Sequence, residues 1–368
     1  MSTAPGPVTD GSGSAPVRQS HGAARLDDAV NHLRARRARA NGFLPTVVPY
    51  AGYGTPHWAR ILGRVVLARE PRAGSRTDRL YRRREESVRG WRSFTSVPIN
   101  DVPVIAEIGG VEHVLRPDRG GVIDQVIPVE LSPGRHEVRL RPHGSDSVST
   151  AVILVVGEET VFGIVSDVDD TVMVTWLPRP LLAGWNTFVL DEHARVPTPG
   201  MAVLYERIRS ERPRAPFIYL STGPWNVAPT LRRFLTRNMF PSGPLLLTDW
   251  GPTHDRLFRS GRGHKEQNLA RLATEFPGVK WLLFGDDGQH DEEIYSDFIA
   301  QHPDSVAAVA IRQLYVTEAV LAGGRSKAQR HSEAGGVPWV YGPDGMSLYK
   351  QLRDLGFVGG HHDEGKRV

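Results

Sequence analysis

After Glu159 the sequence alternates short apolar runs with amphipathic stretches, and this alternation narrows the possible folds more than any other feature. The apolar runs have strand length and include VFGIVSD, APFIYLS, GPLLLTD, KWLLFGD and VAAVAIRQL. Between them lie helical patterns such as MAVLYERIRSE, HKEQNLARLATEF and DEEIYSDFIAQH. The alternation predicts an α/β fold with a parallel sheet and helices on both faces. Functional groups collect at the carboxyl ends of the strands in such sheets, so the chemistry is expected there.

The region before Glu159 shows a different pattern. Between about Pro45 and Val156, short β-branched runs are separated by turn signals such as D-R-G-G and S-P-G-R. Several such strands predict a small all-β, sandwich-like domain that precedes the α/β part. The stretch from Arg69 to Arg92 interrupts the strands and is rich in charge. We interpret it as a solvated insertion, with contact to an anionic surface as the alternative.

Composition and local pattern divide the chain further. Residues 1–20 are rich in Gly, Ser, Pro, Ala and Thr, which predicts a disordered tail. Residues 21–42 are predicted to form a basic helix, because arginines cluster near its end and an Asn-Gly stop signal follows. We interpret it as a capped surface helix, with a basic helix on a membrane surface as the alternative. The remaining boundaries assign the β domain to residues 43–157, the α/β domain to residues 158–360 and a tail to residues 361–368.

Overall composition excludes several classes of protein. A length of 368 residues suits two average domains. The chain has no cysteine, so any metal requires oxygen or histidine ligands. No apolar run approaches the roughly 20 residues that a membrane span requires, and the first residues do not resemble a secretory signal. We therefore expect a cytoplasmic location, with peripheral contact to the inner membrane face. The net charge of +4 is small and no recognised motif is found, so no specific nucleic-acid partner is expected.

The strongest chemical signal follows the first apolar run of the α/β part. There the sequence Ser-Asp-Val-Asp-Asp-Thr places the carboxylates of Asp167 and Asp169 two positions apart, just before Thr171. Bringing two carboxylates together is costly unless a cation or a proton lies between them. The alternative is that the acidic group only caps a following helix, but other strand ends carry matching polar groups.

Two further groups suit an anionic ligand. The next strand ends in Ser221, Thr222 and Gly223, where a hydroxyl and the free backbone N–H groups of a helix start form a natural seat for phosphate. The same residues are also ordinary turn chemistry. Lys265 lies at the start of a later helix, and its compact ammonium group suits neutralisation of a phosphoryl group. A lone lysine, however, is more often a solvated surface residue.

A second acidic group ends the strand KWLLFGD. This strand delivers Asp286 and Asp287, and a glycine-containing turn returns Asp291 to the same place. Hard oxygen ligands without cysteine favour Mg²⁺ over zinc or copper. His290 lies in the same turn, and a solvent-facing position suits it better than a role as a ligand.

The chain resembles the haloacid dehalogenase-like (HAD-like) phosphohydrolases in the order of four motifs. These are D-x-D-x-T, a strand ending in serine, a lysine at a helix start and G-D-D-x-x-x-D. More narrowly, the chain is similar to the App1-type phosphatidate phosphatases, which are relatives of the lipins, and it resembles a bacterial member of that group. The similarity lies in SDVDDT, S-x-x-P-W, H-K and GDDGQHDEEIY. The likeness runs from about Tyr50 to PWVYGPDGMSLYKQLRDLGF and covers most of the chain. It implies a HAD-like Rossmann-type catalytic domain.

The resemblance implies phosphoryl transfer through an aspartyl-phosphate intermediate, which the residues themselves also permit. Asp167 would be the nucleophile. Asp169 would protonate the leaving alkoxide and then accept a proton from water. Ser221 and Lys265 would bind the transferring phosphoryl oxygens.

The resemblance also implies a Mg²⁺ site. The cation would be held by the Asp167 carboxylate, the Asp169 backbone carbonyl and Asp286, and it would offset the repulsion between nucleophile and phosphate. Asp287 and Asp291 would lie beside these ligands and orient metal-bound water, so both remain candidate metal residues.

The spacing of the motifs leaves no room for a full cap domain over this site. Helices and strands already occupy the intervals on either side of Ser221. The segment 174–196 is therefore predicted to be a short apolar flap that suits a membrane-borne ester. The alternative is that it packs on the β domain. The candidate substrate-binding residues are Thr171, Thr222, Gly223, Trp176 and Trp185.

The leading hypothesis is a Mg²⁺-dependent phosphatase that converts phosphatidate to diacylglycerol and phosphate at a membrane surface. A second hypothesis keeps the chemistry and changes the substrate to a phosphoprotein or to a soluble sugar or inositol phosphate. A third is a non-catalytic binding or scaffold protein that acts through its β domain. The sequence does not identify a protein partner for that domain.

Overall fold

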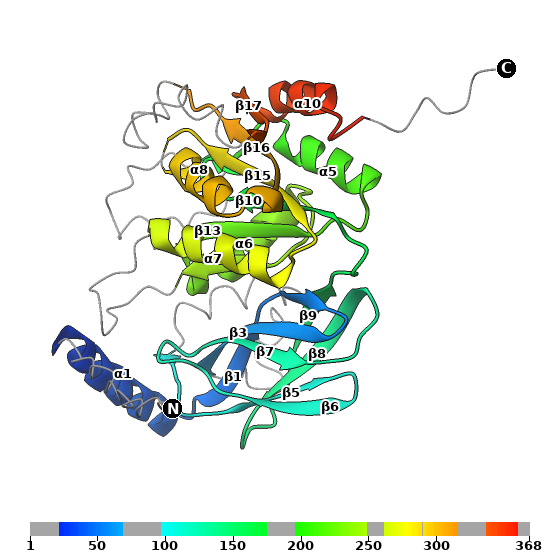
Figure 1. Cartoon of the computed structure of the whole chain (residues 1–368). Helices are drawn as coiled ribbons and strands as arrows, with labels where there is room; N and C mark the ends of the chain where they lie inside the picture. The colour runs from blue at the N-terminus through cyan, green and yellow to red at the C-terminus, as the bar shows by residue number, and fades with distance from the viewer. Residues whose placement is uncertain are drawn as a thin grey trace, which may run out of the picture.

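The computed structural model describes residues 22–68, 97–174, 196–248, 261–288, 290–315 and 336–359. The β-rich part of the chain, blue to cyan, lies below the α/β part in Figure 1. Several predicted features lie outside the described residues. They are the tails at 1–20 and 361–368, the insertion at 69–92, and Trp176 and Trp185 of the flap.

A helix, α1 (Gly22–Ala40), opens the described chain in the range where the basic helix is expected. Ala35 and Ala38 are buried against the β domain, and the surrounding arginines are exposed. The helix ends where the chain turns through Gly42, whose φ of +75° is a conformation that glycine adopts without steric cost. α1 thus lies on the β domain, remote from the helices of the α/β part (Figure 1).

The β domain contains strands whose order in the sheet is β1-β3-β2-β9-β8-β5-β6, with β4 and β7 also paired to β3. The long strand β3 pairs with four others, which folds the sheet around a core of its own made from residues such as Val65, Ile123 and Ile153. This confirms the predicted all-β region. The strands are β1 (Leu44–Pro49), β2 (Gly52–Thr55), β3 (Trp58–Ala68), β4 (Val97–Pro98), β5 (Val104–Ile108), β6 (Val111–Leu115), β7 (Val122–Pro128), β8 (Gly134–Pro142) and β9 (Ser149–Val155).

The second sheet is wholly parallel, in the order β14-β13-β10-β15-β16-β17. Its central strands are buried along nearly their whole length, as expected for a sheet covered on both faces. Chain order reverses between β10 and β15, and ligands bind at such reversal points in open α/β sheets. The strands are β10 (Phe162–Asp167), β13 (Phe217–Pro224), β14 (Leu245–Thr248), β15 (Lys280–Asp286), β16 (Val306–Arg312) and β17 (Trp339–Gly342).

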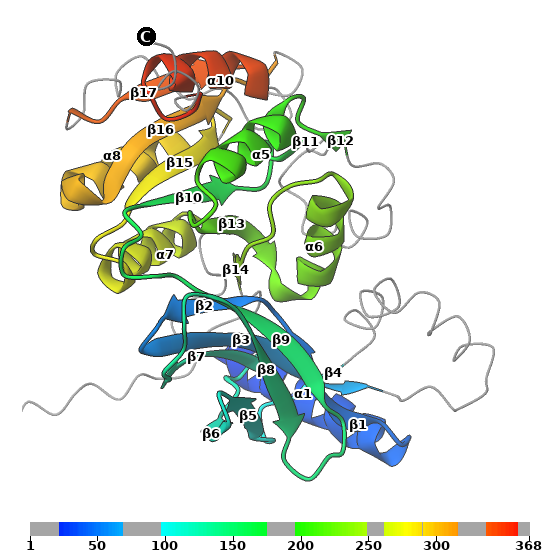
Figure 2. The same ribbon diagram turned by 90° about the vertical axis from the view of Figure 1, so that its right-hand side faces the viewer.

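Helices cover both faces of this sheet, as predicted. One face carries α5 and α10, which pack on each other, and the opposite face carries α7 and α8 (Figure 2). The helices are α5 (Met201–Glu211), α6 (Ala228–Arg237), α7 (Gly261–Glu275), α8 (Asp291–Gln301) and α10 (Gly345–Asp354), with single helical turns η1 (Trp225–Val227) and η2 (Pro303–Ser305). Among the described residues, no helix is long and apolar enough to cross a membrane.

A two-stranded sheet lies just after the first acidic motif. It pairs β11 (Met173–Val174) with β12 (Val196–Pro197), so the two ends of the segment predicted as a flap are held together. The body of that segment lies outside the described residues.

Candidate active site

A tight turn follows β10 and carries the D-x-D motif. The backbone N–H groups of Val172 and Met173 both donate to the Val168 carbonyl, at 3.0 and 3.1 Å. Asp170 lies at φ +60°, a left-handed conformation that aspartate tolerates better than most residues. The turn therefore reverses the chain within a few residues and leaves Asp167 and Asp169 at the carboxyl end of the central strand.

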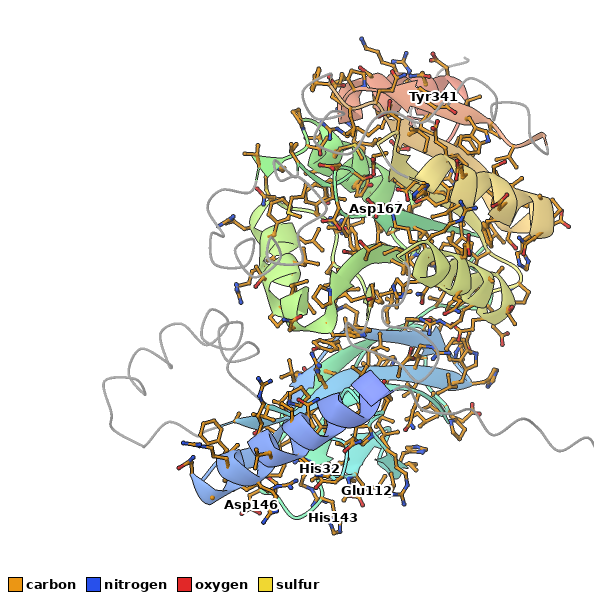
Figure 3. All side chains as sticks on the ribbon, turned by 90° about the vertical axis from the view of Figure 1, so that its left-hand side faces the viewer. His32, Glu112, His143, Asp146, Asp167 and Tyr341 are labelled. Atoms are coloured by element: carbon orange, nitrogen blue, oxygen red, sulfur yellow. The ribbon has the colours of Figure 1, made fainter. Side chains whose placement is uncertain are left out.

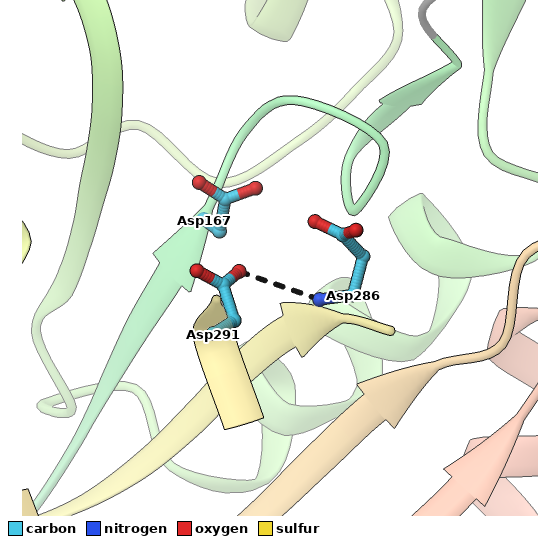
Figure 4. Close-up of side chains that lie close together, drawn as sticks. All are labelled: Asp167, Asp286 and Asp291. Carbon is cyan, nitrogen blue, oxygen red and sulfur yellow. Dashed lines mark hydrogen bonds between the residues drawn. The ribbon is translucent and has the colours of Figure 1, made fainter. Parts of the chain in front are cut away.

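Three carboxylates converge at the reversal point of the sheet, as Figure 4 shows. Asp167, Asp286 and Asp291 each offer an oxygen within 4.8 Å of the others, and all three side chains are buried. The backbone N–H of Asp286 donates to Asp291 Oδ2 at 3.4 Å. Gly285 permits this approach, since a Cβ there would lie only 2.8 Å from the same oxygen. Figure 3 places Asp167 deep in the α/β part.

Lys265 lies among these carboxylates on the first turns of α7. Its Nζ is 2.6 Å from Asp167 Oδ1 and 2.5 Å from Asp291 Oδ1, and the side chain is buried. Burial alone lowers the pKa of Lys265, but the surrounding carboxylates outweigh it and hold the pKa above its ordinary value. Lys265 is therefore an ammonium group, and the reading of it as a solvated surface lysine is excluded.

One ammonium facing three carboxylates leaves the group short of positive charge. Burial raises the pKa of Asp167 well above its usual range, and neighbouring carboxylates add to this against the opposing effect of Lys265. The Oδ2 atom of Asp167 is buried without a hydrogen-bond partner. Buried carboxylates are paired or coordinate metals, so an orphaned oxygen in this group fits a cation ligand.

Ser221 lies beside Asp169. Ser221 Oγ donates to Asp169 Oδ2 at 3.0 Å and accepts from the backbone N–H of Gly223 at 3.0 Å. The other Asp169 oxygen is buried and unpartnered. Strand β13 shifts register between Leu220 and Pro224, which takes Ser221 and the two residues after it out of the regular ladder.

The start of α7 packs against this serine loop. A Cβ at Gly261 would lie 2.7 Å from Thr222 Cγ2, so only glycine allows the helix to begin so close to the loop. The helix that carries Lys265 thus begins against the loop that carries Ser221 and Thr222. A hydroxyl, backbone N–H groups at a helix start and an ammonium are together suited to an anionic oxygen.

Other predicted site residues lie in different surroundings. Asp287 Oδ1 accepts from the backbone N–H of Leu314 at 2.8 Å, so its carboxylate is not part of the group of three. The Asp169 carboxylate is also outside that group and faces Ser221. The Thr171 hydroxyl is buried close to the turn and has no hydrogen-bond partner.

Two buried charged residues near the site are absent from the sequence prediction. Arg312 is fully buried at the end of β16 and donates from a terminal guanidinium nitrogen to the Asp170 carbonyl at 2.7 Å. Glu292 is fully buried at the start of α8, and burial together with nearby carboxylates raises its pKa to about 7. Arg312 could have been found from the sequence because it is a basic residue at a strand end, where the other site residues also lie.

The structure thus defines an α/β protein with three buried carboxylates and a buried lysine at the reversal point of its parallel sheet. Residues 162–313 match the family described as "Phosphatidate phosphatase APP1, catalytic domain". The segment begins at β10 and ends just after β16, so it contains every residue of the cluster described above.

Two curated relatives match over part of their length. Phosphatidate phosphatase APP1 of Saccharomyces cerevisiae is 30% identical over 152 residues, which cover 41% of this chain and 25% of that protein. An uncharacterized protein of Schizosaccharomyces pombe is 26% identical over 211 residues, which cover 52% of this chain and 33% of that protein. The chain therefore spans a quarter to a third of the length of these relatives.

Among solved structures, a carbohydrate acetylesterase from Xanthomonas citri matches at 9% identity over 82% of this chain and 69% of that one. Its TM-score of 0.31 is too low to bear on fold or function.

Proposed function

We propose that this chain is a Mg²⁺-dependent phosphatase that hydrolyses a phosphate monoester, with phosphatidate as the leading substrate. The observation that carries the proposal is the buried group of Asp167, Asp286 and Asp291 with Lys265 in its midst. The match of residues 162–313 to a phosphatidate phosphatase catalytic family supports the choice of substrate.

Mg²⁺ fits the donor set. The three carboxylates supply only oxygen, which suits Mg²⁺, and Asp167 Oδ2 is buried without a partner. We assign Asp167, Asp286 and Asp291 as residues that hold the cation, with the Asp169 carbonyl and Asp287 as further candidates. The cation would supply positive charge that offsets the repulsion between an anionic carboxylate and an anionic phosphate.

In the proposed reaction the Asp167 carboxylate attacks phosphorus, and the bond from phosphorus to the ester oxygen breaks. Asp169 donates a proton to that oxygen, so the leaving group departs as a neutral alcohol. Water then attacks the aspartyl phosphate while Asp169 takes its proton, which releases phosphate and restores Asp167. Ser221 orients Asp169 before the substrate binds, and Ser221 and Lys265 would then contact the phosphoryl oxygens.

The proposed location is the cytoplasm, with the protein reaching phosphatidate from the membrane surface. The HAD-like assignment of the catalytic domain, residues 158–360, belongs to the same proposal. It is supported by the order of the motifs along the parallel sheet.

The test measures phosphate released by the purified protein from phosphatidate vesicles and from soluble esters, with Mg²⁺ and with a chelator. We expect release from phosphatidate that requires Mg²⁺ and is lost in Asp167→Asn. Asp304→Asn, at an exposed position in η2, is the matched control and should keep full activity. Release from soluble esters only would favour the second substrate class. An Asp167→Asn variant as active as the native chain would refute the proposed mechanism.

A further inference from the structure

The β domain reaches into the loop that carries Ser221. Tyr50, in the turn between β1 and β2, stacks on Trp225 with ring centroids 4.8 Å apart and an interplanar angle of 17°. The Tyr50 hydroxyl donates to the Trp225 carbonyl at 3.0 Å. Both side chains are buried, although 175 positions separate them in the chain.

The serine loop depends on how its two ends are held. Its first end is in the sheet, where Leu220 pairs with Asp167 on β10 and with Leu246 on β14. Its second end resumes pairing only at Pro224, a residue with no backbone N–H to donate to the sheet. The next residue is Trp225, so the contact with Tyr50 lies where the sheet holds the loop most weakly.

The placement of this loop bears on the chemistry directly. Ser221 Oγ accepts the N–H of Gly223 and donates to Asp169, so a shift of the loop would move both the serine and the carboxylate that it orients. Such hydrogen bonds weaken steeply when their distance or angle departs from the optimum. A group that fixes the second end of the loop therefore acts on the site without touching the reacting atoms.

A second tyrosine contact across the same interface lies far from the phosphoryl-binding groups. Tyr53 donates its hydroxyl to Glu275 Oε2 at 2.8 Å, and Arg60 pairs with the same glutamate. Glu275 ends α7, ten positions after Lys265, which is roughly 15 Å along a helix. Tyr53 thus offers a matched comparison, because it is a second buried tyrosine of the β domain whose hydroxyl crosses the interface to a different place.

We propose that Tyr50 is a positioning residue that holds the Ser221 loop in its phosphoryl-binding shape. The β domain is then part of the catalytic unit rather than a separate binding module. This inference rests on the proposed function for its kinetic consequence, but the contact of Tyr50 with the loop does not depend on that function.

The test compares Tyr50→Phe with Tyr53→Phe. Each variant loses one interface hydroxyl and keeps its ring, so both should lose a similar amount of stability in urea unfolding. Tyr50→Phe should lower kcat/KM and raise the inhibition constant of inorganic phosphate by roughly threefold to tenfold, the scale of one lost hydrogen bond. Tyr53→Phe should leave both constants within about twofold of the native values. Tyr50→Leu, which also removes the stacked ring, should exceed the effect of Tyr50→Phe.

Hydrogen exchange of the peptide that spans Ser221 to Val227 gives a readout independent of activity. We expect faster exchange at the Gly223 amide in Tyr50→Phe and native exchange in Tyr53→Phe. If the native protein hydrolyses no phosphate ester, the proposed function fails and the exchange data alone decide the role of Tyr50. Unchanged exchange in Tyr50→Phe would overturn the inference. Equal kinetic constants in the two variants of an active enzyme would overturn it as well.

Discussion

Lys265 is the buried positive charge between Asp167 and Asp291, so its removal perturbs the site most directly. Lys265→Met keeps a flexible chain of similar length and deletes the charge. Removing one partner of a buried ion pair costs about 3–5 kcal/mol, because the other charge is left uncompensated. We expect a loss of this order in the free energy of unfolding near neutral pH without added metal.

The loss should depend on pH with a definite sign. Burial already raises the pKa of Asp167, and Lys265 is the group that opposes this rise. In the variant the folded-state pKa lies still further above the unfolded value, so the native state binds more protons than the unfolded chain. Stability is then retained at low pH and falls as pH rises through the folded-state pKa. The difference between variant and native protein should be larger at about pH 8 than at about pH 5.

The assay is equilibrium unfolding in urea at the two pH values, with Lys280→Met as the control. Lys280 is exposed at the start of β15, so its replacement should change stability by at most about 0.5 kcal/mol. A loss below about 1 kcal/mol for Lys265→Met at the higher pH, or an equal loss at both, would show that the ion pairs do not stabilise the fold as argued.

Three further predictions concern the metal group, the serine and the buried arginine. Mg²⁺ should raise the midpoint of thermal unfolding of the native protein, and Asp286→Asn should abolish most of that rise; an equal rise in both would exclude Asp286 as a ligand. Ser221→Ala should lower kcat/KM by roughly a hundredfold, as measured by steady-state phosphate release, and a change below about threefold would argue against contact with the phosphoryl group. Arg312→Met should destabilise the fold by about 3 kcal/mol in urea unfolding, because the Asp170 carbonyl loses a charged donor inside the core; a loss below about 1 kcal/mol would contradict this.

The sequence predicts that Asp167 and Asp286 lie close together in space, because an apolar run of strand length precedes each of them. Two such strands in a parallel sheet end at the same edge, and the alternation with helices predicts the parallel arrangement. Which of Asp286 and Asp287 faces the site is a finer question. Successive residues at a strand end point in different directions, so only one of the two can turn toward Asp167. The structure assigns Asp286 to the group, while Asp287 binds the backbone of Leu314.

The long-range contacts beside the site could not be predicted from the sequence. Tyr50 meets Trp225 across 175 positions, and Arg312 meets Asp170 across 142. Neither pair shares a helix or a strand period, so local pattern carries no signal for either contact. Both depend on how finished elements pack, and therefore on the whole core rather than on any one segment.

The site contains one buried arginine and one buried lysine, although the chain has only five lysines among 45 basic residues. Their different contacts explain the choice of residue. Arg312 donates to the backbone carbonyl of Asp170, and a guanidinium fork with several fixed donors suits such contacts. Lys265 instead places one compact charge within 2.6 Å of two carboxylates. A guanidinium is larger and planar, so it could not replace this point charge between the two carboxylates. The arginine therefore holds the backbone of the D-x-D turn, and in the proposed reaction the lysine would supply positive charge to the bound phosphate.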